Sequence, residues 1–596
     1  MKSIRVIQRA VWVAFAGSLL QACGQSHSAG TTSVVTPPQV TPGATTCAPI
    51  ADPNGPNPID PANWTAEDFI DNDGLPFDLT LTESAGGPDV SGHASVAMLV
   101  GTSGPFAQRA GRKVLENCGN AVDAVLATAL AVQALVMGSY TTLAGSSRLI
   151  YWEAATGKIT AIDGVWGIPQ NLNVDDMRPF PVTEPKSTLI HGFPDLAAEA
   201  HRRWGTLPWA WLFDPAIYVT DNGIPVDKAW MGIVASKAAS VYLRKEGREI
   251  FLKDSGVAGV GTPYMEGDIF RQPLYSETLR GLQAQGDSPT VRYMYEGEWG
   301  QKMVALVQGY GGVITQDDLN RYHVQVYEGV QTPLLGGEYV MVHPHNDLSS
   351  GARIARALDY LQSLDVTAIG TPYESAEVLF QQLLGWDLLN LNPPSGVHSD
   401  AIVAVDKFGN IATMLHTING VNWGSTGFFV NGISLNDSAQ GQEDAVKEAQ
   451  RPDRTFEEGG GQLPSYIFPT LILDRDGRPF MTTNGVGTAL VELTYARLTD
   501  VLLYGTPIED AVYLPGFGHA YATYTATQGE YDEQLLAEEK QLAIERGYPY
   551  YSIQELPAEA HVTRGSVVAI QIDRQTGALH GGNDGTFGGR VEAIDE

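Results

Sequence analysis

Two apolar runs on either side of a short turn constrain the fold of this chain most strongly. They span residues 401–406 and 411–417, and residues 407–410 between them include Gly409. Both runs are largely apolar on both faces, so we expect two strands that are buried on two sides and joined as an antiparallel pair. A similar pair is predicted at residues 470–473 and 479–483.

Residues 107–136 predict helices instead. Apolar residues recur at helical spacing, and the segment Asn117-Cys118-Gly119-Asn120 ends one helix and starts another. The second helix carries alanine on nearly every face, so we expect it to be buried between layers. Helices early and buried antiparallel strands late predict an α+β protein with helix, sheet, sheet and helix layers.

Composition excludes several classes of protein. The formal charge is 37 minus 68, or -31, although only 18% of the 596 residues are charged, against roughly 25% in an average soluble protein. An acidic surface repels phosphate backbones, so we expect no nucleic-acid partner. The length alone suggests about four domains, and the 43% of hydrophobic residues excludes wholesale disorder.

Three cysteines cannot build a disulfide scaffold or a four-ligand zinc site. The pairing of Cys47 with Cys118 stays open. Four histidines are too loosely spaced to indicate a metal, and we expect neither a metal nor a cofactor: His343, His345, His398 and His416.

The N-terminus has the pattern of a secretory signal, with Lys2 and Arg5 before an apolar run at residues 10–20. The run ends in Leu20-Gln21-Ala22-Cys23, which resembles a bacterial lipobox; an ordinary signal peptide that contains a cysteine is the alternative. We therefore predict a signal peptide at 1–22 and a flexible tether at 23–63 that starts at a lipidated Cys23. No later stretch is long enough to span a bilayer. The protein is expected in the bacterial cell envelope, in the periplasm, with the lipid as its only membrane attachment.

Short motifs recur in a fixed order between residues 96 and 590. They include Gly119-Asn120-Ala121-Val122-Asp123-Ala124, Gly192-Phe193-Pro194, Trp204-Gly205-Thr206-Leu207-Pro208-Trp209, Asp214-Pro215-Ala216, Gly311-Gly312-Val313-Ile314-Thr315 and Ser349-Ser350-Gly351. In this order the chain resembles the gamma-glutamyltransferase (gamma-glutamyltranspeptidase) family of the N-terminal-nucleophile hydrolase superfamily. The resemblance implies a four-layer αββα sandwich and a precursor that cuts itself before a threonine. That threonine is then the nucleophile, and its new amino group is the general base.

Aligned through residues 405–410, the nucleophile position falls on Ser399. A serine supplies the same attacking oxygen without the methyl group that restricts its rotamer. A serine in a surface loop before a strand is the alternative, and Ser395 is a second candidate. Cleavage before Ser399 would leave a large-subunit-like region at 64–398 and a small-subunit-like region at 399–596. The second region has 596 minus 398, or 198, residues.

The resemblance assigns further roles. Thr417 and Asn419 fall on positions that orient the nucleophile and bind the amino acid part of the substrate. Ser465 and its neighbour Tyr466 fall on a substrate contact, and Gly487 falls in the oxyanion loop. The alternatives are that Thr417 and Ser465 cap strands and that Gly487 marks a turn. His398, beside the scissile bond, could assist processing.

The match breaks where the family recognises a glutamyl group. Its arginine for the substrate carboxylate falls on Val165, and its aspartate for the amino group falls near Gly441. Arg148 could replace the missing arginine from the neighbouring strand, or it could be an ordinary arginine on a strand surface. Losing both charges would lower glutamyl affinity by orders of magnitude.

Three functions therefore compete. The first is a self-processing acyltransferase or amidohydrolase on gamma-glutamyl-type amides, such as glutathione-like small peptides, with altered acyl specificity and two fragments associated as a heterodimer. The second is a catalytically inactive family member that serves as an exported binding or structural lipoprotein. The third is an unrelated activity on the same scaffold.

Overall fold

The structure is a computed structural model. It describes residues 55–70, 79, 91–179, 182–257, 260–288, 292–345, 350–387, 399–418, 420, 422–452, 461–465, 467–487, 489–520, 523–548, 552–556 and 565–595. The chain divides into two units, residues 1–41 and 42–596, and every described residue belongs to the second.

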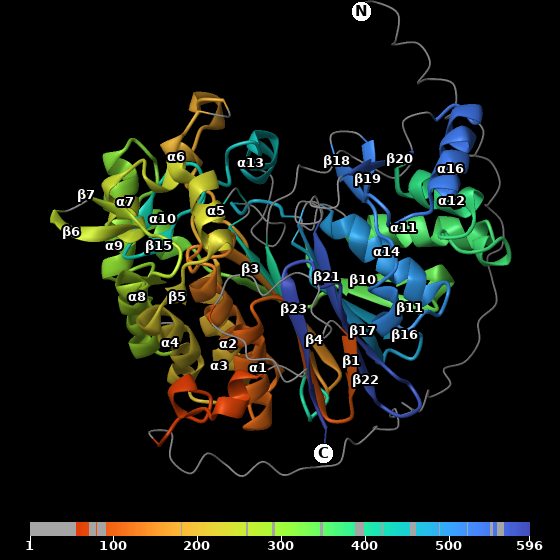
Figure 1. Cartoon of the computed structure of the whole chain (residues 1–596), viewed down its shortest axis with the longest axis horizontal. Coiled ribbons are helices and arrows are strands. Elements are labelled where there is room, and N and C mark those ends of the chain that lie inside the picture. The colour runs from red at the N-terminus through yellow and green to blue at the C-terminus, as the bar shows by residue number, and fades with distance from the viewer. Residues whose placement is uncertain are drawn as a thin grey trace, which may run out of the picture. The chain divides into compact units, whose positions relative to one another are not determined.

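Two seven-stranded sheets lie at the centre of this unit (Figure 1), and all their strand pairs are antiparallel. The β12 sheet has the order β23 (Gly588–Ile594), β2 (Ala97–Ser103), β12 (Asp400–Val405), β13 (Ile411–Thr417), β3 (Ser146–Glu153), β4 (Lys158–Gly164) and β9 (Gln325–Tyr327). The β17 sheet has the order β1 (Ser91–Ala94), β22 (Leu579–Asn583), β21 (Ser566–Ile572), β17 (Pro479–Val486), β16 (Thr470–Asp474), β11 (Tyr339–His343) and β10 (Val330–Leu334). Both sheets therefore mix strands from before and after residue 399.

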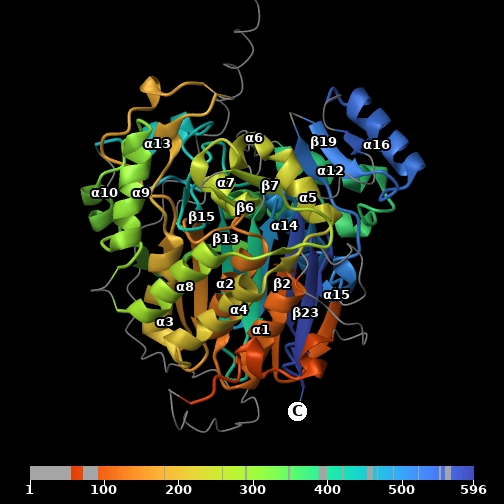
Figure 2. The same cartoon turned by 60° about the vertical axis from the view of Figure 1, so that its left-hand side comes forward.

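Helices cover the outer face of each sheet, which gives the four-layer αββα sandwich (Figures 1 and 2). The helices on the β12 sheet's side are α1 (Pro105–Glu116), α2 (Ala121–Leu135), α3 (Phe193–Trp204), α4 (Asp214–Asn222), α5 (Lys228–Ser236), α8 (Pro273–Gln285), α9 (Glu298–Gly309) and α10 (Gln316–Arg321). Those on the β17 sheet's side are α11 (Ser350–Ser363), α12 (Ala376–Asp387), α14 (Leu490–Leu502), α15 (Ile508–Ala511) and α16 (Glu533–Glu545). A third apolar cluster fills the space between the sheets.

The elements predicted from periodicity are confirmed. The apolar runs around Gly409 form β12 and β13, every residue of which is buried. The helix pair is α1 and α2, and all 15 residues of α2 are buried, as its alanine-rich surface predicts. Asn120 caps α2 by accepting the N–H of Asp123, whose side chain accepts the N–H of Asn120 in return.

The structure corrects the end of the predicted tether. Asn57 donates to the Trp211 carbonyl at 3.2 Å and to the Asp214 carboxylate at 2.7 Å, and Ile59 is fully buried. Residues 57–63 thus pack on the folded body because they carry an apolar anchor and a paired amide. Cys118 is disulfide-bonded, while Cys47 and Cys23 lie outside the described residues. Among the described residues, no helix is long and apolar enough to cross a membrane.

Candidate active site

The two faces of the β12–β13 pair place the predicted nucleophile. Ala401 and Leu415 pack in the cluster between the sheets, whereas Ile402 and Met414 pack against the helices. Because side chains alternate along a strand, Ser399 and Thr417 belong to the face between the sheets. Asp400 pairs with His416 in the register, so Ser399, one residue earlier, lies opposite Thr417.

This row of hydroxyls continues on the next strand. Thr417 pairs with Ser146 of β3, so Ser399, Thr417 and Ser146 occupy neighbouring positions on three strands, about 5 Å apart from one strand to the next. The Ser146 hydroxyl is buried and has no hydrogen-bond partner among the described residues. The structure therefore brings together the predicted nucleophile, the predicted orienting threonine and a third hydroxyl that the sequence analysis missed.

Ser399, the predicted nucleophile, is buried. It is 6% exposed, and within the described part of the chain no hydrogen bond engages its hydroxyl. It lies directly before a central strand, not in an exposed loop, so the alternative reading as a surface-loop serine is wrong. Ser395 and His398 lie outside the described residues.

Directly beneath Ser399, on the helix face, lies a buried acid–histidine pair. The Asp400 carboxylate accepts hydrogen bonds from Thr102 Oγ1 at 2.7 Å, from the Ser103 hydroxyl and from His416 Nε2 at 2.8 Å. Asp400 is 0% and His416 1% exposed. Burial, together with the negative charge of Asp400, raises the pKa of the nearby Tyr140 hydroxyl above its ordinary value.

The sequence itself holds a signal for this pair. Residues 400 and 416 are equidistant from the turn between β12 and β13, so the predicted hairpin already places Asp400 opposite His416. The hydroxyls from Thr102 and Ser103 could not be found in this way, because they are about 300 positions away in the sequence.

Arg148 is neither a surface residue nor free to bind a substrate carboxylate. It is 0% exposed, and its Nε and Nη2 form a bidentate pair with Asp163 at 2.5 and 2.9 Å. Its remaining N–H groups reach the carbonyls of His345, Ser465 and Ile467 at 2.8–3.2 Å. A guanidinium has five N–H donors, and all five are engaged. Arg148 instead holds the segment that contains Ser465.

The two positions to which the resemblance assigns substrate recognition, Val165 and Gly441, are both described by the structure. Val165 directly follows Gly164, the last residue of β4, which pairs with Ser147. Its side chain is buried. Gly441 lies in a turn before α13 (Glu443–Ala449) and has a φ of 81°.

A carboxylate that the sequence analysis passed over does approach this region. Asp437 lies four residues before Gly441, and its Oδ1 is 2.6 Å from where a Cβ on Gly420 would lie. Its Oδ2 accepts the N–H of Ser425 at 2.8 Å, and burial raises the pKa of the Asp437 carboxyl. Gly420 adjoins Asn419, which lies outside the described residues, as do Tyr466 and Cys23.

The remaining predicted residues are placed as follows. Ser465 is buried, and its hydroxyl accepts the N–H of Ile467 at 3.2 Å. Gly487 follows β17 with a φ of 87°, a conformation that favours glycine. Asn484, three residues earlier, donates to Thr413 Oγ1 and to the Met414 carbonyl, both at 3.0 Å, which ties the end of β17 to β13.

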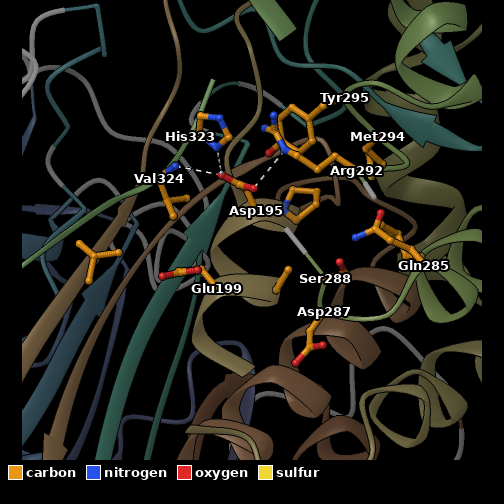
Figure 3. Close-up of a pocket in the computed structure, with 14 residues that line it drawn as sticks. Asp195, Glu199, Gln285, Asp287, Ser288, Arg292, Met294, Tyr295, His323 and Val324 are labelled. Atoms are coloured by element: carbon orange, nitrogen blue, oxygen red, sulfur yellow. Dashed lines mark hydrogen bonds and ion pairs between the residues drawn. The ribbon is translucent and has the colours of Figure 1, made fainter. Parts of the chain in front are cut away.

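A cavity of about 230 Å³ lies elsewhere, between α3, the end of α8 and β9. At its wall, the Asp195 carboxylate accepts the N–H of Val324 at 2.9 Å and pairs with Arg292 at 3.4 Å and His323 at 3.9 Å (Figure 3). None of the predicted site residues lines this cavity. In the described part of the chain, no cluster of His, Cys, Asp or Glu could hold a metal ion.

Comparison with known proteins identifies the family. The sequence matches the family model "Gamma-glutamyltranspeptidase" over residues 107–383 and 392–594. The chain belongs to the gamma-glutamyltranspeptidase family. The relatives of the chain include glutathione hydrolases, and the fold of the chain is that of the N-terminal-nucleophile hydrolases.

Three known proteins to which the chain is similar match different shares of it. The glutathione hydrolase proenzyme of Bacillus subtilis (strain 168) is 23% identical over 83% of this chain and 91% of its own length. The acylase ACY 1 proenzyme of Pseudomonas sp. (strain V22) is 27% identical, but the match covers 46% of this chain and about half (49%) of that protein. The crystal structure of cephalosporin acylase from Bacillus halodurans superposes with a TM-score of 0.69 at 18% identity, over 88% of this chain and all of that one.

Proposed function

We propose that this family member is a self-processing amidohydrolase or acyltransferase in which Ser399 is the nucleophile. The observation that carries the proposal is the row on the β12 sheet, where an unengaged Ser399 hydroxyl lies opposite Thr417 at the start of a central strand. The printed names of two relatives, a glutathione hydrolase proenzyme and an acylase proenzyme, support an amide-cleaving activity and a precursor form.

The chemistry has two stages. In the precursor, the Ser399 hydroxyl adds to the carbonyl carbon of residue 398, the peptide nitrogen leaves with a proton, and water hydrolyses the resulting ester. In the processed protein, the free amine of Ser399 takes the hydroxyl proton as the oxygen attacks a substrate amide. The protonated amine then donates to the leaving amine. Water or an acceptor amine finally removes the acyl group.

Supporting groups surround this serine. Thr417 orients the nucleophile, and the N–H groups around Gly487 bind the oxyanion. Asn419, Ser465 and Tyr466 contact a small amide or peptide substrate of gamma-glutamyl type. The acyl specificity of the enzyme is altered. Val165 carries no charge, and the N–H groups of Arg148 are already engaged, so neither residue can bind a substrate carboxylate. Asp437 remains available for a substrate amino group.

Mass spectrometry and a denaturing gel of the purified full chain test the proposal. We expect a fragment that begins Ser399-Asp400 and has 596 minus 398, or 198, residues, together with hydrolysis of a gamma-glutamyl or other acyl p-nitroanilide. Ser399→Ala should stay intact and inactive, whereas Ser395→Ala should behave like the wild type. A single intact chain without turnover would overturn the proposal and favour the alternative of an inactive exported binding lipoprotein.

We also propose export and lipid attachment, which rest on the sequence at residues 1–23 alone. Growth with labelled palmitate should label the protein, and Cys23→Ser should abolish the label while leaving cleavage before Ser399 unchanged. Label retained in Cys23→Ser would contradict attachment at this cysteine.

A further inference from the structure

The residue that follows the candidate nucleophile is fixed to both neighbouring strands. Asp400 accepts hydrogen bonds from Thr102 and Ser103 of β2 on one side and from His416 of β13 on the other. The three donors saturate most of the carboxylate's acceptor sites, and hydrogen bonds to a charged group are about twice as strong as neutral ones. The side chain of residue 400 is therefore held in one place within a site that excludes water.

The second nitrogen of the histidine extends this network to helix α2. His416 Nδ1 contacts the Thr141 hydroxyl, and it lies 3.1 Å from Gln133 Nε2, which donates to it. An amide NH₂ can only donate, so Nδ1 is the acceptor from Gln133 and Nε2 is the nitrogen that faces the Asp400 carboxylate. A continuous chain of contacts thus runs from Gln133 through His416 to Asp400.

This network has a particular value beside a cleavage point. Once the bond before Ser399 is cut, residue 399 is a chain end, and residue 400 is its only covalent anchor. The Ser399 hydroxyl and its free amine must nevertheless stay aligned with Thr417 and with the substrate carbonyl. A misplacement of about 1 Å can cost on the order of 100-fold in rate.

We propose that Asp400 and His416 are positioning residues, which hold the new N-terminus at Ser399 in its attacking geometry from the opposite face of the sheet. The proposal rests on the proposed function of Ser399. Neither side chain reaches the substrate: both are buried against the helices, on the far side of the strands from Ser399.

A matched control lies at the other end of the same strand. Asp406 is also buried, at 1% exposure, and also accepts several hydrogen bonds, from Ala121 N at 3.0 Å, Phe408 N at 2.9 Å and Asn410 N at 3.0 Å. It lies six residues, about 20 Å, from Asp400. Asp400→Asn and Asp406→Asn therefore remove a similar buried charge, but only the first lies beside the nucleophile.

The experiment measures kcat, KM, the rate of precursor cleavage and the melting temperature of the full chain in both variants. In Asp400→Asn, only one amide atom can accept: with Oδ1 towards His416 Nε2–H, the NH₂ group faces the Thr102 and Ser103 hydroxyls, which must then stop donating, and in the other orientation the NH₂ group faces Nε2–H. We expect cleavage or kcat to fall about 30- to 100-fold, with KM changed less than about three-fold. Asp406→Asn should lower the melting temperature by about as much as Asp400→Asn does, and its kcat should stay within about two-fold of the wild type. Equal loss of activity in both variants, in proportion to stability, would overturn the proposal.

A second variant covers the case in which Asp400→Asn does not fold. His416→Gln keeps a donor towards Asp400 but shifts its position, and it should lower kcat at least about ten-fold. Where both single variants fold, the double variant should lose much less than the product of the single losses, because the residues act as a pair. If the loss of kcat in the double variant equals the product of the two single losses, Asp400 and His416 do not act as a pair. A wild type that is cut and active beside an equally active Asp400→Asn sinks this inference alone, whereas an uncut, inactive wild type sinks the proposed function.

Discussion

The two faces of the β12–β13 pair are built from similar polar residues but in opposite states. On the face between the sheets, the Ser399 and Ser146 hydroxyls make no hydrogen bond to a described residue. On the helix face, one residue along, Asp400 and His416 have partners at both carboxylate oxygens and both ring nitrogens. Both faces are buried, so burial alone does not decide the state of a polar group.

In the proposed mechanism, this difference separates the reactive hydroxyl from the residues that position it. An unpartnered buried hydroxyl is costly, so it persists where a ligand would complete its hydrogen bonds. A saturated network makes the opposite contribution, because it fixes backbone positions. In the proposed mechanism, the Ser399 nucleophile would be held in position from the face of the sheet that the substrate does not touch.

The largest expected effect concerns Arg148, the most fully engaged polar group on the face between the sheets. Arg148→Met leaves Asp163 buried without its partner and should lower the free energy of unfolding by about 3–5 kcal/mol. Arg148→Met with Asp163→Leu should recover at least half of that loss, as measured by urea unfolding. Arg280→Met, which breaks an exposed pair with Asp221, should cost under about 1 kcal/mol. A single variant no worse than Arg280→Met would show that Arg148 does not hold the site together.

The next effect tests a buried carboxylate that lacks the donors of Asp400. Burial raises the pKa of Glu492 in α14 from 4.5 to about 7. The pKa of Glu492 is higher in the folded than in the unfolded protein. Its contribution to the free energy of unfolding is therefore full below about pH 4.5 and is lost as the pH rises through 7. It amounts to about 3 kcal/mol. Glu492→Gln should therefore stabilise the protein at pH 8 relative to the wild type and much less at pH 4, as measured by thermal unfolding.

The exposed Glu538→Gln serves as the control, and it should leave the pH dependence unchanged. If Glu492→Gln behaves in the same way, the contrast between a donor-rich and a donor-poor carboxylate is wrong.

The smallest effect concerns Thr417, the neighbour of Ser399 in the row of hydroxyls. Thr417→Val keeps the shape and removes the hydroxyl, and it should lower kcat about 100-fold with little change in KM. Thr482→Val removes an equally buried hydroxyl from β17, where it donates to the Thr470 carbonyl at 3.2 Å, and it should leave kcat unchanged. Steady-state kinetics with the same p-nitroanilide decides between them. If Thr417→Val keeps half of the wild-type kcat, the Thr417 hydroxyl does not contribute to catalysis, and Ser399 is the only hydroxyl of this row that does.

Much of the fold could be predicted because local pattern and tertiary structure agree. The buried hairpin around Gly409 and the alanine-rich α2 were readable from periodicity, since each has one environment along its whole length. The packing of residues 57–63 on the body was not readable, because one buried isoleucine and one paired asparagine do not form a pattern.

The site was predictable only where residues are near in sequence or match a family motif. Ser399 and Thr417 came from such motifs, and their opposition in the sheet follows from the hairpin. The engagement of Arg148 was not predictable, because its partners come from three separate segments that only the tertiary structure unites. Ser146 was missed because a lone serine carries no signal until its strand register is known.

The order of strands in the two sheets has a consequence for a chain cut before Ser399. Strands β12, β13 and β23 of one sheet, and β16, β17, β21 and β22 of the other, would belong to the C-terminal fragment, while their neighbours β1, β2, β3 and β11 belong to the N-terminal one. The fragments share the apolar cluster on the helix side of each sheet and the cluster between the sheets, so they have no interface that could open while each stays folded. Separation and unfolding would be one event, and thermal stability would rise with protein concentration, as in an obligate dimer.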